Sequence, residues 1–114
     1  GMNLFPANIE GNRAYVNGTE IDLGRGYGKP EGKVEIGVRP EYLKLSSTAG
    51  LPVNIRRVED VGRHKIVRAE FFGHDINIVA PEGTPIGADM TRVTFEPGKI
   101  NVYADDWRIE GEAA

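Results

Sequence analysis

Hydrophobic and polar residues alternate along this chain in short runs that end at turn signals, a pattern that predicts β-strands joined by tight loops. Near the amino terminus, Asn17-Gly18 is a strong hairpin signal because a type I′ turn needs positive φ at both central residues. A second two-residue loop is expected at Gly11-Asn12. The two loops pair Arg13 with Asp22, Ala14 with Ile21, Val16 with Thr19, Ile9 with Ala14 and Ala7 with Val16. The apolar residues of these pairs and Phe5 share one face, which predicts a three-stranded meander over residues 3–23.

A glycine-rich segment, residues 24–32, follows the meander and contains four glycines and one proline. This composition predicts a flexible loop. The next strand is expected from Val34 to Val38. It should stop at Arg39-Pro40, because proline lacks an amide hydrogen and keeps the preceding residue extended. The remaining strands are expected within residues 33–103.

Three further features of the pattern indicate strands in the second half of the chain. The apolar phase of Leu51, Val53 and Ile55 shifts by one residue across Arg56-Arg57, which predicts a β-bulge. A hairpin with its turn at Gly73-His74 would pair Phe71 with Ile76, Ala69 with Ile78 and Val67 with Ala80. A last hairpin is expected to join residues 92–95 to residues 100–103 through a Pro97-Gly98 turn.

About nine short strands and no long helix place the chain in the all-β class, as a small antiparallel barrel with an amino-terminal β-meander. The 114 residues are enough for a single domain, 1–114. Valine, isoleucine and glycine dominate the apolar and turn positions, in agreement with many short strands. The chain has no cysteine, which excludes disulfides and thiolate metal sites and fits a reducing compartment.

The net charge of −3 argues against a protein that binds nucleic acid through bulk positive charge. A basic cluster does occur, but acidic residues are interspersed with it. The basic members are Arg56, Arg57, Arg63, His64, Lys65 and Arg68, and the acidic ones are Glu59, Asp60 and Glu70. A barrel that binds single-stranded nucleic acid is therefore the weakest of three functional hypotheses, and it would require salt-dependent binding of oligonucleotides.

The sequence lacks the residue constellations of common enzymes. The two histidines, His64 and His74, are expected at opposite ends of a hairpin, roughly 30 Å apart, too far to share a metal ion. The adjacent carboxylates Glu59-Asp60 and Asp105-Asp106 should point to opposite sides of a strand or lie in a turn. The glycine-rich segment matches neither the dinucleotide fingerprint nor a P-loop. We therefore expect no catalytic, cofactor or metal site within this chain.

The segment Gly37-Val38-Arg39-Pro40-Glu41-Tyr42-Leu43 resembles the G-[VI]-R-P-E-x-[LIF] segment in the carboxy-terminal domain of ABC importer ATPase subunits of the maltose and glycerol-phosphate type. Further matches occur in the family's order. Met2-Asn3-Leu4-Phe5-Pro6-Ala7 resembles M-N-[LF]-[LF]-x-[AG], Val58-Glu59-Asp60-Val61-Gly62 resembles V-E-x-[LV]-G, and Val93-Thr94-Phe95-Glu96-Pro97 with Ile100-Asn101-Val102-Tyr103 resembles the family's closing segment. Together these matches span almost the whole chain.

The resemblance implies an OB-like barrel of the TOBE or MOP-like kind, and a role as a regulatory and dimer-supporting domain. It implies that an ATPase domain, which binds ATP and magnesium, should precede Met2 in the parent subunit of a sugar or sugar-phosphate importer. The partners implied are a second copy of the subunit, its own nucleotide-binding domain, the membrane subunits indirectly, and in some transporters a regulatory protein. The location implied is the cytoplasmic face of the membrane.

Two candidate sites follow from these hypotheses. Arg39, Pro40 and Glu41 either only hold a corner of the barrel, with a charge-assisted hydrogen bond, or contact the ATPase domain or a second copy. The alternative function is a module that binds an oxyanion such as molybdate, or a sugar. For an oxyanion, the candidate donors are backbone amides of the loop that contains Gly24, Gly26 and Gly28.

Overall fold

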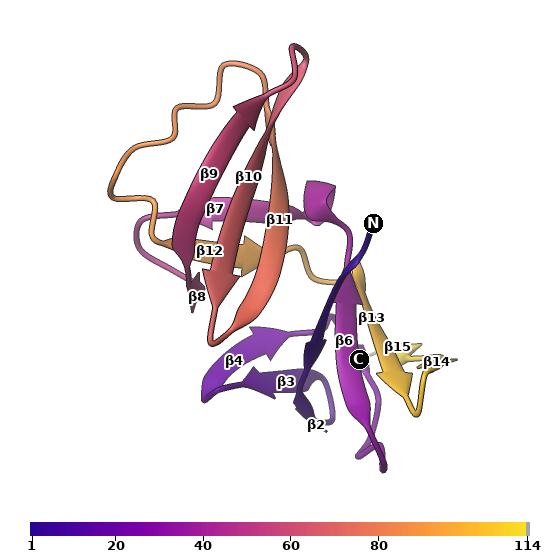
Figure 1. Cartoon of the computed structure of the whole chain (residues 1–114). Coiled ribbons are helices and arrows are strands. Elements are labelled where there is room, and N and C mark those ends of the chain that lie inside the picture. The colour runs from indigo at the N-terminus through magenta and orange to yellow at the C-terminus, as the bar shows by residue number, and fades with distance from the viewer. Residues whose placement is uncertain (114) are drawn as a thin grey trace.

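A computed structural model describes residues 1–113, which fold almost entirely as antiparallel β-structure (Figure 1). The one helical element among these residues is a 3-10 turn, η1 (Pro40–Tyr42). The strands are β1 (Asn3–Pro6), β2 (Asn8–Glu10), β3 (Arg13–Val16), β4 (Thr19–Asp22), β5 (Arg25–Gly26), β6 (Val34–Val38), β7 (Leu43–Ser46), β8 (Leu51–Pro52), β9 (Asn54–Asp60), β10 (His64–Phe71), β11 (His74–Pro81), β12 (Arg92–Phe95), β13 (Ile100–Ala104), β14 (Trp107–Ile109) and β15 (Glu112–Ala113).

The strands form five sheets, with the orders β1-β6-β13-β14, β11-β10-β9, β7-β12-β8, β15-β5 and β2-β3-β4. The long β9-β10-β11 sheet lies across the β7-β12-β8 sheet, and the β2-β3-β4 sheet lies at the other end beside β1 and β6 (Figure 1). The all-β antiparallel class is therefore confirmed. Within the described residues the sheets do not join into a closed barrel.

The amino-terminal meander has the predicted register in its second hairpin. Arg13 pairs with Asp22 and Ala14 with Ile21, and Asn17 and Gly18 have φ of 46° and 81°. The first strand differs from the prediction, because β1 pairs with β6 and not within the meander. The amide of Ala7 donates to the carbonyl of Val34, so the predicted pairing of Ala7 with Val16 is wrong. The meander sheet contains only β2, β3 and β4, and β1 completes a different sheet.

The β10-β11 hairpin has the predicted buried face but a different register. Its turn is Phe72-Gly73, with φ of 46° and 81°, and not Gly73-His74. Phe71 therefore pairs with His74, and every predicted partner moves by two residues; Ala69 pairs with Ile76 and Val67 with Ile78. A shift of two preserves the face that each side chain occupies, which is why the prediction of a shared buried face holds.

The predicted bulge in β9 is confirmed. The pairing of β9 with β10 passes from Arg57 opposite Arg68 to Ile55 opposite Ala69, so Arg56 is the extra residue. The bulge places Ile55 and Val58 on the same face of the sheet although they are three positions apart in the sequence, a spacing that would put them on opposite faces of a regular strand.

The predicted carboxy-terminal hairpin is wrong, although both of its strands exist. β12 pairs with β7 on one side and with β8 on the other, while β13 pairs with β6 and β14. Each strand already has two neighbours, so no edge is left for the two to pair. The turn between them, closed by the Lys99 amide on the Glu96 carbonyl, instead passes the chain from one sheet to another.

A single hydrophobic core joins these sheets. Phe5 of β1 packs edge-on against Phe71 of β10 at 4.8 Å and against Phe95 of β12 at 6.1 Å between ring centroids. Asn3 adds a polar link, because its side-chain amide donates to the Asn77 carbonyl and accepts from the Asn77 amide, each at 2.9 Å. The Asn3 side chain thus makes the two hydrogen bonds that the backbone of a neighbouring strand would make to Asn77. These bonds tie β1 to β11 at a buried position.

Candidate functional site

Arg39, Pro40 and Glu41 lie where β6 ends and the chain turns into β7. Arg39 has extended backbone angles and precedes the 3-10 turn, whose bonds run from the Tyr42 amide to the Arg39 carbonyl and from the Leu43 amide to the Pro40 carbonyl. The side chains of Arg39 and Glu41 are exposed, and among residues 1–113 neither takes part in an ion pair. The backbone therefore holds this corner, and both charges remain available at the surface.

Tyr42 fixes the corner to the rest of the molecule. Its carbonyl accepts the Glu96 amide at 3.0 Å, and the Lys99 ammonium lies 5.1 Å from the centre of its ring. The 3-10 turn also packs against β11. The exposed charges of Arg39 and Glu41 are thus presented by a rigid support, as a contact surface requires.

The glycine-rich segment is more ordered than the sequence predicts. Its residues Arg25 and Gly26 form β5, which pairs with β15 near the carboxy terminus. Gly28 accepts the Gly11 amide at 2.7 Å, and the Tyr27 amide donates to the Gly11 carbonyl. The amide of Gly24 donates to the Asp22 carboxylate at 2.9 Å. A carboxylate therefore already binds the first amide of the candidate oxyanion loop.

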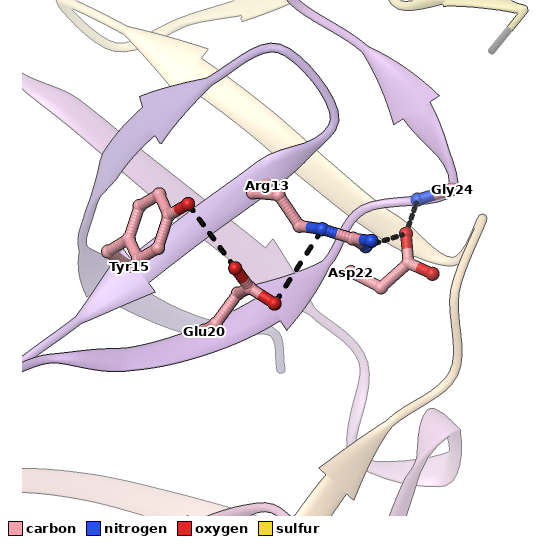
Figure 2. Close-up of polar contacts among 5 residues, drawn as sticks. All are labelled: Arg13, Tyr15, Glu20, Asp22 and Gly24. Carbon is pink, nitrogen blue, oxygen red and sulfur yellow. Dashed lines mark hydrogen bonds and ion pairs between the residues drawn. The ribbon is translucent and has the colours of Figure 1, made fainter.

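A polar cluster covers the outer face of the β3-β4 hairpin, as Figure 2 shows. The Arg13 guanidinium lies between Glu20, at 3.7 Å, and Asp22, at 3.1 Å, and the Tyr15 hydroxyl donates to Glu20 at 3.3 Å. Partial burial, and then the nearby Glu20 carboxylate, raise the pKa of Tyr15 above its ordinary value. The sequence register predicts the Arg13 and Asp22 pair; the same register places Tyr15 opposite Glu20, a pair that the sequence reasoning missed.

An open groove of about 670 Å³ lies beside this cluster. It runs between the meander and the glycine-rich segment, and its charged lining residues are Glu10, Lys29 and Lys33. Lys33 is engaged by Asp106 at 2.9 Å, which raises the pKa of its ammonium group. The mixture of both charge signs gives the groove no clear preference for an anion.

Part of the basic cluster of the β9-β10-β11 sheet is neutralised by acidic partners. Arg56 pairs with Glu70 at 2.6 Å, and Glu59 accepts from both Arg57 and Arg68 at 2.7 Å. The hydrogen bond from Arg68 lowers the pKa of Glu59 below its ordinary value. These pairs engage three of the basic side chains and so weaken the positive field that a nucleic-acid interface would need.

The titratable groups considered for catalysis or metal binding do not gather. His64 pairs with Pro81 and His74 with Phe71, so they lie at opposite ends of the β10-β11 ladder. Seven residues along β10 separate the two ends by about 23 Å, less than the 30 Å that the incorrect turn implied. Across residues 1–113, no three histidine or acidic side chains form a group that could hold a metal ion.

The adjacent carboxylates Asp105 and Asp106 form the turn between β13 and β14, with φ of 50° and 70°. The Asp105 carboxylate accepts the Lys33 amide at 2.9 Å, and Asp106 pairs with the Lys33 side chain. The two residues therefore have a structural role, in which they fix the start of β6 to the tip of the β13-β14 hairpin.

Comparison with known proteins identifies relatives of this chain. The chain is 31% identical over 107 residues to the sn-glycerol-3-phosphate import ATP-binding protein UgpC of Ruegeria sp. (strain TM1040). It is 32% identical over 108 residues to the protein of the same name from Ruegeria pomeroyi (strain ATCC 700808 / DSM 15171 / DSS-3). This chain is homologous to ABC importer ATP-binding subunits. A relative of the same name from Jannaschia sp. (strain CCS1) is 19% identical over 106 residues.

Each of these alignments covers 92% of the chain but only 30% of the relative. The chain thus spans less than a third of the length of the importer subunits that it matches. No family model matches the chain. In the described part of the chain, no helix has the length and apolar character needed to cross a membrane. The family resemblance predicted from the Arg39-Pro40-Glu41 segment and its neighbours is confirmed.

Proposed function

We propose that this chain is the carboxy-terminal TOBE-type domain of the ATP-binding subunit of an importer for sugars or for sugar or glycerol phosphates, and that it supports the dimer of that subunit. The observation that carries the proposal is the alignment of 92% of the chain with 30% of the length of importer ATP-binding subunits. The order of the short motifs, with the Arg39-Pro40-Glu41 segment in the first half and the Val93-Pro97 segment near the end, adds support.

In this proposal the chemistry belongs to another part of the parent subunit. A preceding domain binds ATP and magnesium and hydrolyses the nucleotide, and the present chain contributes no catalytic group. The subunit works at the cytoplasmic face of the membrane, beside the membrane subunits through which the substrate passes.

The mechanism proposed for the chain is mechanical. A domain with one continuous hydrophobic core moves as a rigid body. If two such bodies stay in contact while the ATPase domains separate, they keep those domains at a high effective concentration for each other. The two ATPase domains then reassociate after each round of hydrolysis within a dimer that has not come apart, so the step is intramolecular.

The Arg39-Pro40-Glu41 corner is the surface we propose for contact with the ATPase domain or with a second copy. Its two charges are exposed, unpaired within the described residues and rigidly supported by Tyr42. A charged group at the rim of an interface acts mainly on association rate and on orientation.

Reversal of one charge at this corner should weaken the coupling between assembly and ATP hydrolysis. In the whole subunit, Glu41→Lys should reduce ATPase activity and dimer formation severalfold, because a repulsive contact replaces an attractive one. Glu82→Lys, at an exposed position in the loop between β11 and β12, is the matched control and should leave both unchanged. Equal activity and assembly for Glu41→Lys and the wild type would contradict the role of the corner.

A further inference from the structure

Strand β9 is long and lies at the edge of its sheet, where its outer side is unpaired. It has seven residues, and within residues 1–113 only β10 pairs with it (Figure 1). Edge strands expose a row of amide and carbonyl groups that can pair with another strand, and proteins usually keep such edges short or cover them. Val58, at the middle of this edge, has 43% of its surface exposed. Val58 also lines a shallow hollow with Ile86 and Ala88 of the loop between β11 and β12, but no described strand pairs with the outer side of β9. An exposed apolar residue near the centre of such an edge indicates a surface that another strand can use.

The backbone groups of Val58 point away from β10. The Val61 amide donates to the His64 carbonyl, so these two residues form a hydrogen-bonded pair at the hairpin end. Bonded and non-bonded pairs alternate along an antiparallel ladder. Because Val58 lies three residues from Val61 and opposite Val67, its amide and carbonyl face the open side. No backbone hydrogen bond from another described segment reaches Val58 there.

The side chains on this edge are complementary to their own copy. Suppose that β9 pairs antiparallel with β9 of a second chain about a twofold axis at Val58. Val58 of one copy then faces Val58 of the other. Arg57 of each copy faces Glu59 of the other copy, so the contact contains this charge pair twice. Arg57 and Glu59 lie on the same face of the strand, since their side chains already meet at 2.7 Å within one chain. A shift of the axis to either neighbour would place Arg57 opposite Arg57, or Glu59 opposite Glu59. Opposite charges across a strand pair stabilise it and like charges destabilise it, so the edge selects one register.

We propose that β9 is the surface through which two copies of this chain pair, edge to edge and centred on Val58. This inference deepens the proposed dimer-supporting function and rests on it, because it names the contact that keeps the two copies together. The bulge at Arg56 limits the new pairing to the carboxy-terminal half of the strand. Such a contact is small, so in the whole subunit it would act together with other contacts of this domain, such as the Arg39-Pro40-Glu41 corner.

The natural chain contains no cysteine, which allows a direct test by cross-linking of the 114-residue chain. Val58→Cys places one thiol on the twofold axis, opposite its own copy. Val61→Cys is the matched control, because Val61 is 49% exposed on the same hairpin. Its two copies would lie six residues apart along the pairing, about 20 Å. Under mild oxidation with copper phenanthroline, Val58→Cys should form disulfide-linked dimers at least about tenfold faster than Val61→Cys. Equal rates, at equal reactivity toward a maleimide, would overturn the proposal.

Charge exchange at the same edge gives a second readout. With Val58→Cys as the reporter, Arg57→Glu alone and Glu59→Arg alone should each slow cross-linking about tenfold, since each homodimer then opposes like charges. A mixture of the two variants should cross-link mainly as the heterodimer, in which both charge pairs are again complementary. Circular dichroism of each variant verifies the fold. A statistical mixture of homodimers and heterodimers would contradict the register.

The outcomes separate this inference from the proposed function. If the whole importer subunit forms dimers that depend on this domain while Val58→Cys and Val61→Cys cross-link equally, the β9 contact is wrong and the proposed function stands. If cross-linking is selective for Val58→Cys but the parent polypeptide has no ATPase domain, the β9 contact stands and the proposed function fails.

Discussion

Phe5→Ala should lower the free energy of unfolding of this chain by about 3–5 kcal/mol, the range for removal of a buried aromatic ring. Phe5 is fully buried and belongs to β1, and its ring packs against Phe71 of β10 and Phe95 of β12. Three separate sheets therefore meet at this one ring. Its loss leaves a cavity that the sheets cannot close without moving relative to one another. Urea unfolding followed by circular dichroism measures the effect.

Leu4→Ala is the matched control for this prediction. Leu4 is the preceding residue of the same strand, but its side chain lies on the opposite face and is 49% exposed. Its truncation should cost less than about 1 kcal/mol, because a half-exposed side chain leaves no closed cavity. If Phe5→Ala costs no more than Leu4→Ala, the sheets are not joined through Phe5 and the described core is wrong.

Gly50→Ala should destabilise the chain by about 3 kcal/mol. Gly50 has φ of 102°, a conformation that costs an alanine about 1–2 kcal/mol. An added Cβ would also collide with the backbone of Val93, whose carbonyl carbon would lie 2.6 Å away. Val93 belongs to the central strand of the β7-β12-β8 sheet, so the clash can be relieved only by displacement of a paired strand. Thermal and urea unfolding of the variant report the loss.

Gly62→Ala separates the strain at Gly50 from the collision. Gly62 has a comparable φ of 96°, and an added Cβ there meets no atom within 4 Å. This substitution should therefore cost only the conformational strain, about 1–2 kcal/mol. The difference between the two variants measures the cost of the collision with β12. A similar loss for both variants would mean that the contact between Gly50 and β12 is not as described.

Local features of the fold could be predicted because short-range rules determine them. The Asn17-Gly18 turn fixes the register of β3 and β4, and the phase shift at Arg56-Arg57 identifies the bulge. Both depend only on the conformations that these residues prefer and on which side chains must be buried. The turn at Phe72-Gly73 escaped the same rules, since phenylalanine is not expected at a positive φ.

Long-range pairings could not be predicted from these rules. β1 lies beside β6, and β12 and β13 belong to different sheets, although both arrangements leave the buried face of each strand unchanged. The alternation of apolar residues specifies the face of a strand but not its neighbour. The strands β5 and β15 were missed for a related reason, because two-residue strands have no periodicity of their own.

The candidate sites show the same difference between local features, which the sequence predicts, and long-range arrangement, which it does not. The corner at Arg39-Pro40 was predicted because proline ends a strand, and the structure places it there with two exposed charges. The β9 edge was not predicted, because the sequence does not say which strand lies at the border of a sheet. Only the observed sheet order, together with the exposure of Val58, draws attention to Arg57 and Glu59.

We propose above that this chain holds two ATP-binding subunits together while their ATPase domains are apart. Sedimentation velocity of the whole subunit without nucleotide, with and without the segment that corresponds to residues 3–113, tests it most directly. We expect a dimer when the segment is present and a monomer when it is removed, because the remaining domains lose their effective concentration for each other. Dimers of equal stability with and without the segment would contradict it.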